Sequence, residues 1–146
     1  MSATVIEQTA SLPPSIQRQL AATLIIPYRN FCEDSRLEQI LAVMQGGGGD
    51  NELQAVRQLA QSLVVDRHTR CGAEGDWQEQ AGYFIARAAA AAIAVTPKGG
   101  AIPKVVQNCR MAASCAALAH GEESDISSEQ ITEIEQFLAQ QKGEQP

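Results

Sequence analysis

The hydrophobic pattern contains two long segments in which almost every residue is small or apolar. Residues 81–95 read AGYFIARAAAAAIAV and carry a single charge, at Arg87, while residues 111–119 read MAASCAALA. A helix that is apolar nearly all round has no face for water and belongs inside a bundle. Alanine favours helix, and its short side chain lets a neighbouring helix approach closely. We therefore predict two central helices, at about 77–95 and about 103–120, packed against each other.

The remaining segments show apolar residues at helical spacing, interrupted by recognisable start and stop signals. Proline is favoured in the first turn of a helix, so Pro13 or Pro14 is predicted to begin one. Pro27 removes a backbone donor and predicts a kink, or two short helices. Further helices are predicted to start at Ser35, at Asp50 and at Ser127 or Ser128.

The length of 146 residues and the composition favour one all-α domain, residues 1–146, built as a compact bundle of about six helices. Aromatic residues make up only 4% of the chain, which suits packed helices better than strands. Residues 1–10 and 142–146 are predicted to be frayed tails. Residues 66–75 (DRHTRCGAEG) show no periodicity and are predicted to form the longest loop.

Charge limits the classes of partner. The formal net charge is -6 and the pI is near 4.9, so the chain repels phosphate backbones, and we expect no nucleic acid partner. An acidic surface does suit a basic protein, because complementary fields steer the encounter. The charge balance therefore favours a protein partner.

The ends of the sequence and its cysteines bear on location. No basic flank followed by an apolar core opens the chain, and neither Ala-rich segment reaches the 20 or so apolar residues of a membrane span. The four cysteines, Cys32, Cys71, Cys109 and Cys115, would make a thin disulfide framework and are expected to be free thiols. We expect a cytoplasmic protein that does not enter a membrane.

The segment 66–75 holds the first candidate site. Cys71 follows His68 by three residues, and Arg67 and Arg70 add positive charge that would favour the thiolate. Cys71 and His68 are therefore the weak candidates for catalysis. Arg67, His68 and Arg70 together form the most basic short stretch of an acidic chain, which favours contact with a partner or an anion. The alternative is a solvated loop whose charges pair with nearby carboxylates.

The turn TPKGGAIPK at 96–104 holds the second candidate site. Lys98, Gly99, Gly100 and Lys104 lie at the predicted start of a helix, where backbone amides and the helix dipole favour an anion. A tight connection between antiparallel helices would select the same proline and glycine residues without any ligand. Both interpretations stay open from the sequence.

Motifs with a defined chemistry are missing. The glycine run 46–49 has no preceding strand and no following Lys-Ser or Lys-Thr pair, so it predicts a hinge and not a phosphate loop. The histidines and cysteines show neither CxxC nor HxxxH spacing. No Gly-x-Ser-x-Gly elbow occurs either. We expect no metal and no cofactor.

Two functions are consistent with these observations. The first is a noncatalytic cytoplasmic helical interaction protein, an adaptor or an immunity-like binder of a basic protein partner. The alternative is a helical protein that binds a small molecule or an anion through the 96–104 turn or the 66–75 loop. Homodimerisation is considered beside both, since a bundle rich in small residues can leave an apolar face uncovered.

Overall fold

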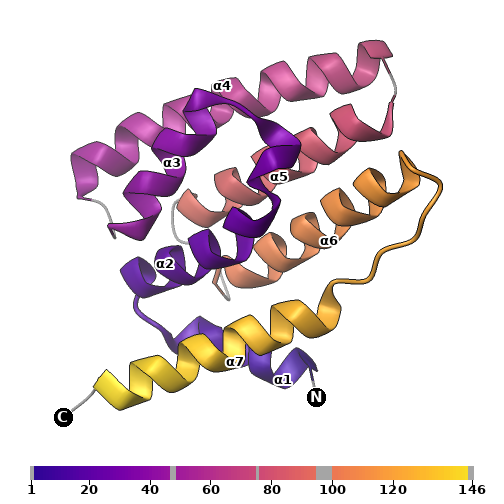
Figure 1. The fold of residues 1–146 in the computed structure, drawn as a ribbon. Coiled ribbons are helices and arrows are strands. Elements are labelled where there is room, and N and C mark those ends of the chain that lie inside the picture. The colour runs from indigo at the N-terminus through magenta and orange to yellow at the C-terminus, as the bar shows by residue number, and fades with distance from the viewer. Residues whose placement is uncertain (1, 47–48, 75, 95–99, 145–146) are drawn as a thin grey trace.

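The computed structural model describes residues 2–46, 49–74, 76–94 and 100–144, with side chains described from residue 5 to 141 except at 71–74. These residues form seven α-helices and two 3-10 helices, without a strand among them (Figure 1). The all-α bundle is confirmed, with one helix more than predicted. The elements are α1 (Ser2–Gln8), η1 (Thr9–Ser11), α2 (Pro14–Ile25), η2 (Ile26–Cys32), α3 (Ser35–Gln45), α4 (Asp50–Glu74), α5 (Trp77–Ile93), α6 (Ile102–Leu118) and α7 (Ser127–Glu144).

The two Ala-rich helices, α5 and α6, lie at the centre of the bundle, as predicted. They run side by side, and α5 also contacts α4, α2, α3 and η2 (Figure 1). Alanine occupies five of the eight buried positions of α5 but only two of the eight in α6, so the small side chains that favour close approach come mainly from α5. The described bounds are shorter than the predicted 77–95 and 103–120, and residues 95–99 lie outside the described part of the chain.

The segment before α3 follows the behaviour of proline. Helix α2 begins at Pro14, and the chain passes into the 3-10 helix η2 at Ile26, directly before Pro27. The prediction of two short helices is therefore correct. Helix α3 then begins at Ser35, where Asp34 acts as the N-cap and accepts a hydrogen bond from the amide of Arg36 at 2.9 Å. η2 also contacts α5 near its beginning, where the carbonyl oxygen of Phe31 lies close to Gly82.

The predicted loop at 66–75 is wrong. Helix α4 continues without interruption from Asp50 to Glu74. Its buried positions recur three or four residues apart, at Leu53, Val56, Ala60 and Leu63, and the next position in that series is Arg67, which is also buried. A charged residue in a core position breaks the hydrophobic pattern although it leaves the helix intact.

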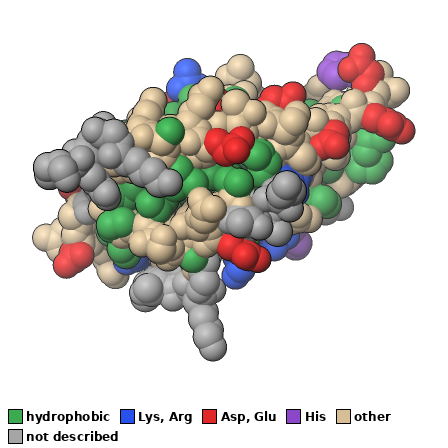
Figure 2. All heavy atoms as spheres, turned by 90° about the horizontal axis from the view of Figure 1, so that it is seen from below, with side chains coloured by type: hydrophobic (Ala, Val, Ile, Leu, Met, Phe, Trp, Pro, Cys, Tyr) green, Lys and Arg blue, Asp and Glu red, His purple; other side chains and the backbone are tan. Residues whose placement is uncertain are grey.

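The chain ends differ from the predicted tails. Residues 2–8 form helix α1, and Val5 and Ile6 pack against the core. Helix α7 continues to Glu144 and lies beside α1 (Figure 1). On the face that these two helices occupy, hydrophobic side chains gather in a band across the middle, with acidic side chains around it (Figure 2). No described helix combines the length and the apolar character that a membrane-spanning helix requires.

Candidate functional site

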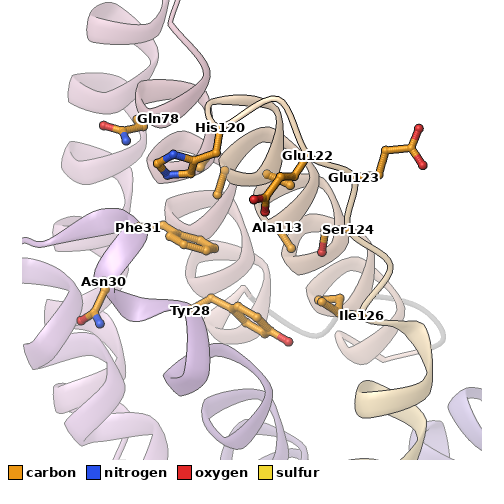
Figure 3. Close-up of a pocket in the computed structure, with 13 residues that line it drawn as sticks. Tyr28, Asn30, Phe31, Gln78, Ala113, His120, Glu122, Glu123, Ser124 and Ile126 are labelled. Atoms are coloured by element: carbon orange, nitrogen blue, oxygen red, sulfur yellow. The ribbon is translucent and has the colours of Figure 1, made fainter.

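A cleft of about 550 Å³ opens at one end of the bundle, and we refer to it as the end cleft. It forms where η2, the beginning of α5, the end of α6 and the connector 119–126 meet (Figure 3). Three stretches that are distant in sequence therefore contribute to it: η2, the beginning of α5, and the end of α6 with its connector. Its lining residues are Tyr28, Asn30, Phe31, Gln78, Ala81, Ala113, Ala116, Ala117, His120, Glu122, Glu123, Ser124 and Ile126.

The base of the end cleft consists of alanines from the two central helices. Ala81 and Ala113 are buried, whereas Ala116 and Ala117 are partly exposed to the cleft. Alanine fills little volume, so the surface stays hollow where no neighbouring helix covers it. The small residues that let α5 and α6 approach each other also leave this space open.

Aromatic side chains from η2 form one wall. The ring centroids of Tyr28 and Phe31 lie 6.0 Å apart, with 30° between the ring planes. Both rings face the cleft in Figure 3. Burial raises the pKa of Tyr28, and electrostatic interactions with Cys109, Glu129 and Glu133 raise it further. The wall therefore presents two aromatic faces to the cleft.

The connector that follows α6 carries the charged groups. Gly121 adopts a left-handed conformation with φ of 70°, and the amide of Glu122 donates to the carbonyl of Ala117 at 2.9 Å. This turn directs the Glu122 carboxylate into the cleft, whereas the Glu123 carboxylate points away from it (Figure 3). Within the described structure, neither carboxylate takes part in an ion pair. Glu122 is therefore an unneutralised anion above an aromatic wall.

The first group of sequence-predicted residues lies on α4, outside the end cleft. Arg67 is only 7% exposed and donates from Nη2 to the carbonyl of Glu33 at 3.3 Å. Its guanidinium also lies 3.9 Å from Asp34 and 4.0 Å from Glu79. Arg67 thus pairs with groups of its own chain, and its predicted role in binding a partner or an anion stays a prediction. The helical continuation of α4 turns this position toward the core.

His68 and Arg70 remain on the surface of α4. The His68 ring lies 5.4 Å from the ring of Tyr83, centroid to centroid, and Arg70 lies 3.7 Å from Asp66. The alternative in which the charges of this segment pair with nearby carboxylates is therefore present for Arg70, whose partner is Asp66. The side chain of Cys71, the weak catalytic candidate, lies outside the described residues.

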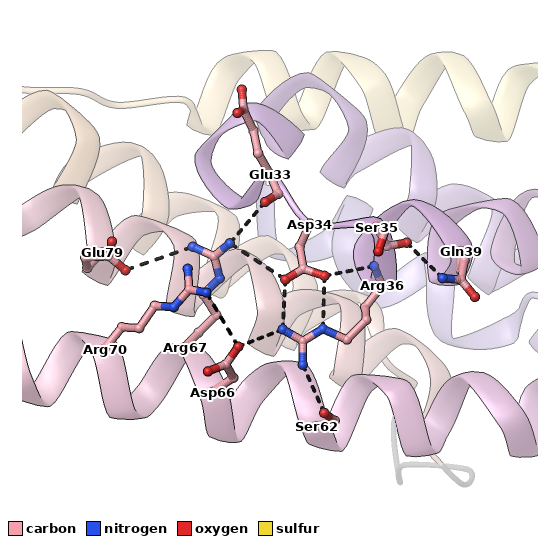
Figure 4. A network of polar contacts seen from close by, with 10 residues as sticks. All are labelled: Glu33, Asp34, Ser35, Arg36, Gln39, Ser62, Asp66, Arg67, Arg70 and Glu79. Carbon is pink, nitrogen blue, oxygen red and sulfur yellow. Dashed lines mark hydrogen bonds and ion pairs between the residues drawn. The ribbon is translucent and has the colours of Figure 1, made fainter.

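A polar network links this part of α4 to α3 (Figure 4). Arg36 binds both carboxylate oxygens of Asp34, and its Nη2 also reaches Asp66 at 2.7 Å. Its Nη1 donates to the hydroxyl of Ser62 at 2.9 Å. These contacts use four of the five N–H donors of Arg36, so the network joins α3 to α4.

The predicted anion site at 96–104 is only partly described. Lys98 and Gly99 lie outside the described residues. Gly100 has a φ of 88°, and a Cβ there would lie 2.9 Å from Oε1 of Gln17. The same oxygen accepts from the amide of Ala101 at 3.3 Å, so Gln17 contacts the start of α6. Lys104 is exposed. The positive φ and the close approach of Gln17 therefore account for the glycine at position 100 without a ligand.

The remaining reactive groups are buried. Cys32, Cys109 and Cys115 are buried in the core, and none of them forms a disulfide. Burial raises the pKa of Cys32 to about 11 and that of Cys109 to about 12. Among the described residues, no three side chains of His, Cys, Asp or Glu are grouped so that they could hold a metal ion.

The sequence pattern does not indicate the end cleft. The acidic stretch at 122–125 is typical of a polar connection between helices, and Tyr28 and Phe31 carry no signal beyond their spacing around Pro27. The one available hint was an acidic pair directly after the predicted end of a central helix. Comparison with protein-family models, with curated proteins and with solved structures finds no match to this chain.

Proposed function

We propose that this chain is a noncatalytic binding protein for a basic protein partner, and that the end cleft receives a lysine or arginine side chain of that partner. The observation that carries this proposal is the Glu122 carboxylate, which points into a cleft walled by Tyr28 and Phe31 (Figure 3). A cation in that position meets an opposite charge and two aromatic faces.

The energetics favour a cationic side chain over a neutral one. A guanidinium or ammonium over an aromatic face gains about 0.5–1 kcal/mol at exposed sites, and more when water is excluded. An ion pair with a carboxylate adds to this, and the net charge of -6 attracts a basic surface over longer range. Arg110, a cation whose charge acts on Asp125 of the connector, does not line the cleft, and its Nε donates to Gln130 at 2.7 Å.

The groups of the cleft support binding better than catalysis. His120 and Ser124 both line it, yet no hydrogen bond joins them in the described structure, so the two are not paired as a nucleophile and its base. The thiols of Cys32, Cys109 and Cys115 are in the core and do not line the cleft. A cytoplasmic location fits these three thiols, none of which forms a disulfide.

The alternative function, small-molecule or anion binding through the 96–104 turn or the 66–75 segment, has less support. Arg67 is buried and paired, and Lys98 and Gly99 lie outside the described residues. The end cleft itself is acidic, which disfavours an anion there.

The proposal can be tested directly with a single side chain as probe. N-acetylarginine amide is titrated into the full chain and followed by backbone amide NMR shifts, with N-acetylcitrulline amide as the uncharged control of nearly equal shape. We expect saturable shifts in residues 28–31 and 113–126 with arginine, and much smaller shifts with citrulline. Equal shifts with the two probes would contradict the proposal.

Two neighbouring glutamates provide a matched pair of variants. Glu122→Gln removes the carboxylate that points into the cleft, whereas Glu123→Gln removes one that points away (Figure 3). Arginine binding should weaken in the first variant and persist in the second. The same pair applied to affinity capture from cell extract should lose a basic protein only with Glu122→Gln. Capture that is identical for both variants would exclude the cleft as the contact site.

A further inference from the structure

A second cavity, of about 340 Å³, lies at the opposite end of the α5–α6 pair, and we refer to it as the arginine cavity. It opens beside the end of α5, at Ala92 and Ala94, and the beginning of α6, at Gly100 and Ala101. Two cations line it, Arg18 from α2 and Arg57 from α4. The other lining residues are Ala10, Leu12, Pro14 and Gln17.

Contacts at the end of α5 fix the orientation of Arg57. Its Nε donates to the carbonyl of Ile93, one of the last carbonyls of the helix, and its side chain is half-buried. That bond uses one donor of the guanidinium. Within the described structure, Arg57 forms no ion pair with a carboxylate, and no hydrogen bond uses its Nη1 or Nη2. Two charged nitrogens therefore remain on a side chain whose position is fixed.

Arg18 and Arg57 are close enough to influence each other. Burial lowers the pKa of Arg18, the positive charge of Arg57 lowers it further, and Asp50 acts in the opposite direction. Among the described residues, Arg57 and Asp50 both act electrostatically on Arg18 in this region of an otherwise acidic chain. Holding like charges together costs free energy, and an anion between them would remove that cost.

We propose that the arginine cavity binds a small oxyanion, of the class of inorganic phosphate or a phosphate monoester. Arginine presents its donors as a planar fork that matches phosphate oxygens, and the beginning of α6 adds the positive end of a helix dipole. The volume exceeds that of one phosphate group. Leu12, Pro14 and Ala92 supply apolar surface for the organic part of a monoester. This site is independent of the function proposed for the end cleft.

The probe for this site is sodium phosphate, titrated into the full chain at constant ionic strength with sodium chloride as reference. Phosphate should raise the melting temperature in a saturable manner, because a ligand that binds only the folded state stabilises it. Phenyl phosphate should act at lower concentration if the organic part uses the apolar surface. If phenyl phosphate raises the melting temperature over the same concentration range as inorganic phosphate, the ligand is phosphate itself. Equal responses to phosphate and chloride would overturn the proposal.

Three variants locate the response. Arg57→Gln should weaken phosphate binding about tenfold or more, because a hydrogen bond to a charged group contributes about 1.5–3 kcal/mol. Ala94→Glu places a carboxylate at an exposed position of the cavity wall, leaves the bond from Arg57 to Ile93 in place, and should abolish binding. Arg29→Gln removes an exposed cation on η2 and is the control that should retain it. Retention in both cavity variants would overturn the proposal, even if one of them were unstable.

Discussion

Arg36 binds Asp34 through two parallel hydrogen bonds, from Nε to Oδ1 at 3.0 Å and from Nη2 to Oδ2 at 2.8 Å. Asp34 is also the N-cap of α3, so one carboxylate caps a helix and holds an arginine that reaches α4 (Figure 4). The hydrogen bonds from Arg36 lower the pKa of Asp34 to about 2. The contacts at the start of α3 therefore depend on the ionisation of Asp34.

This dependence predicts a specific response to acid. The pKa of Asp34 is lower in the folded state than its ordinary value of 3.8, so its contribution to stability is present above pH 3.8 and is lost as pH falls toward 2. Asp34→Asn keeps a good N-cap but removes the charge. The variant should be less stable at pH 7 by about 1–3 kcal/mol. Urea unfolding at several pH values should show this difference shrinking between pH 3.8 and 2, and parallel curves would contradict the prediction.

Gly82 is predicted to be intolerant of a side chain. A Cβ at this position of α5 would lie 2.8 Å from the carbonyl oxygen of Phe31 and 3.1 Å from Nη1 of Arg67. Alanine is otherwise the better helix former, so Gly82→Ala would stabilise an open helix position. Here we expect a loss of about 1–3 kcal/mol in the free energy of unfolding, because η2 and Arg67 must both shift. An unchanged or higher melting temperature would show that the contact relaxes freely.

The central part of the fold was predictable because its physical cause is local. An alanine-rich helix with a single charge has no polar face to turn toward water. Helices α5 and α6 therefore lie at the centre of the bundle. The end of α4 was not predictable in this way. Arg67 occupies a core position of that helix. Burying its charge costs free energy, and the contacts with Glu33, Asp34 and Glu79, which the sequence does not reveal, offset that cost.

The candidate sites were less predictable than the fold. The end cleft combines residues from η2, α5, α6 and a connector, and no spacing within the sequence links Tyr28 with Glu122. The arginine cavity likewise joins Arg18 with Arg57 through the packing of α2 against the ends of the central helices. Gly100 of the 96–104 turn lines that cavity, and the anion site predicted at this turn stays a prediction.

The core cysteines are predicted to be unreactive in the folded protein. Cys32 and Cys109 have no exposed surface, and their pKa values of about 11 and about 12 leave almost no thiolate at pH 8. In a Cys71→Ser background, Ellman's reagent should modify the three remaining thiols only at the rate of unfolding. Adding denaturant should then accelerate all three together. Rapid modification of two or three thiols in the native chain would contradict the packing described for them.

The docking of α7 is predicted to depend on Gln130. This side chain is 2% exposed, donates to the carbonyl of Val106 at 3.1 Å and accepts from Nε of Arg110 at 2.7 Å. Gln130→Leu would leave Arg110 without that partner, at an expected cost of about 1–3 kcal/mol. Because the bond joins α7 to α6, amide hydrogen exchange should accelerate in residues 127–141 more than in α5. The exposed Gln136→Leu on the same helix serves as the control and should leave exchange unchanged. Uniform acceleration across the bundle would show instead that α7 and the central helices open as one unit.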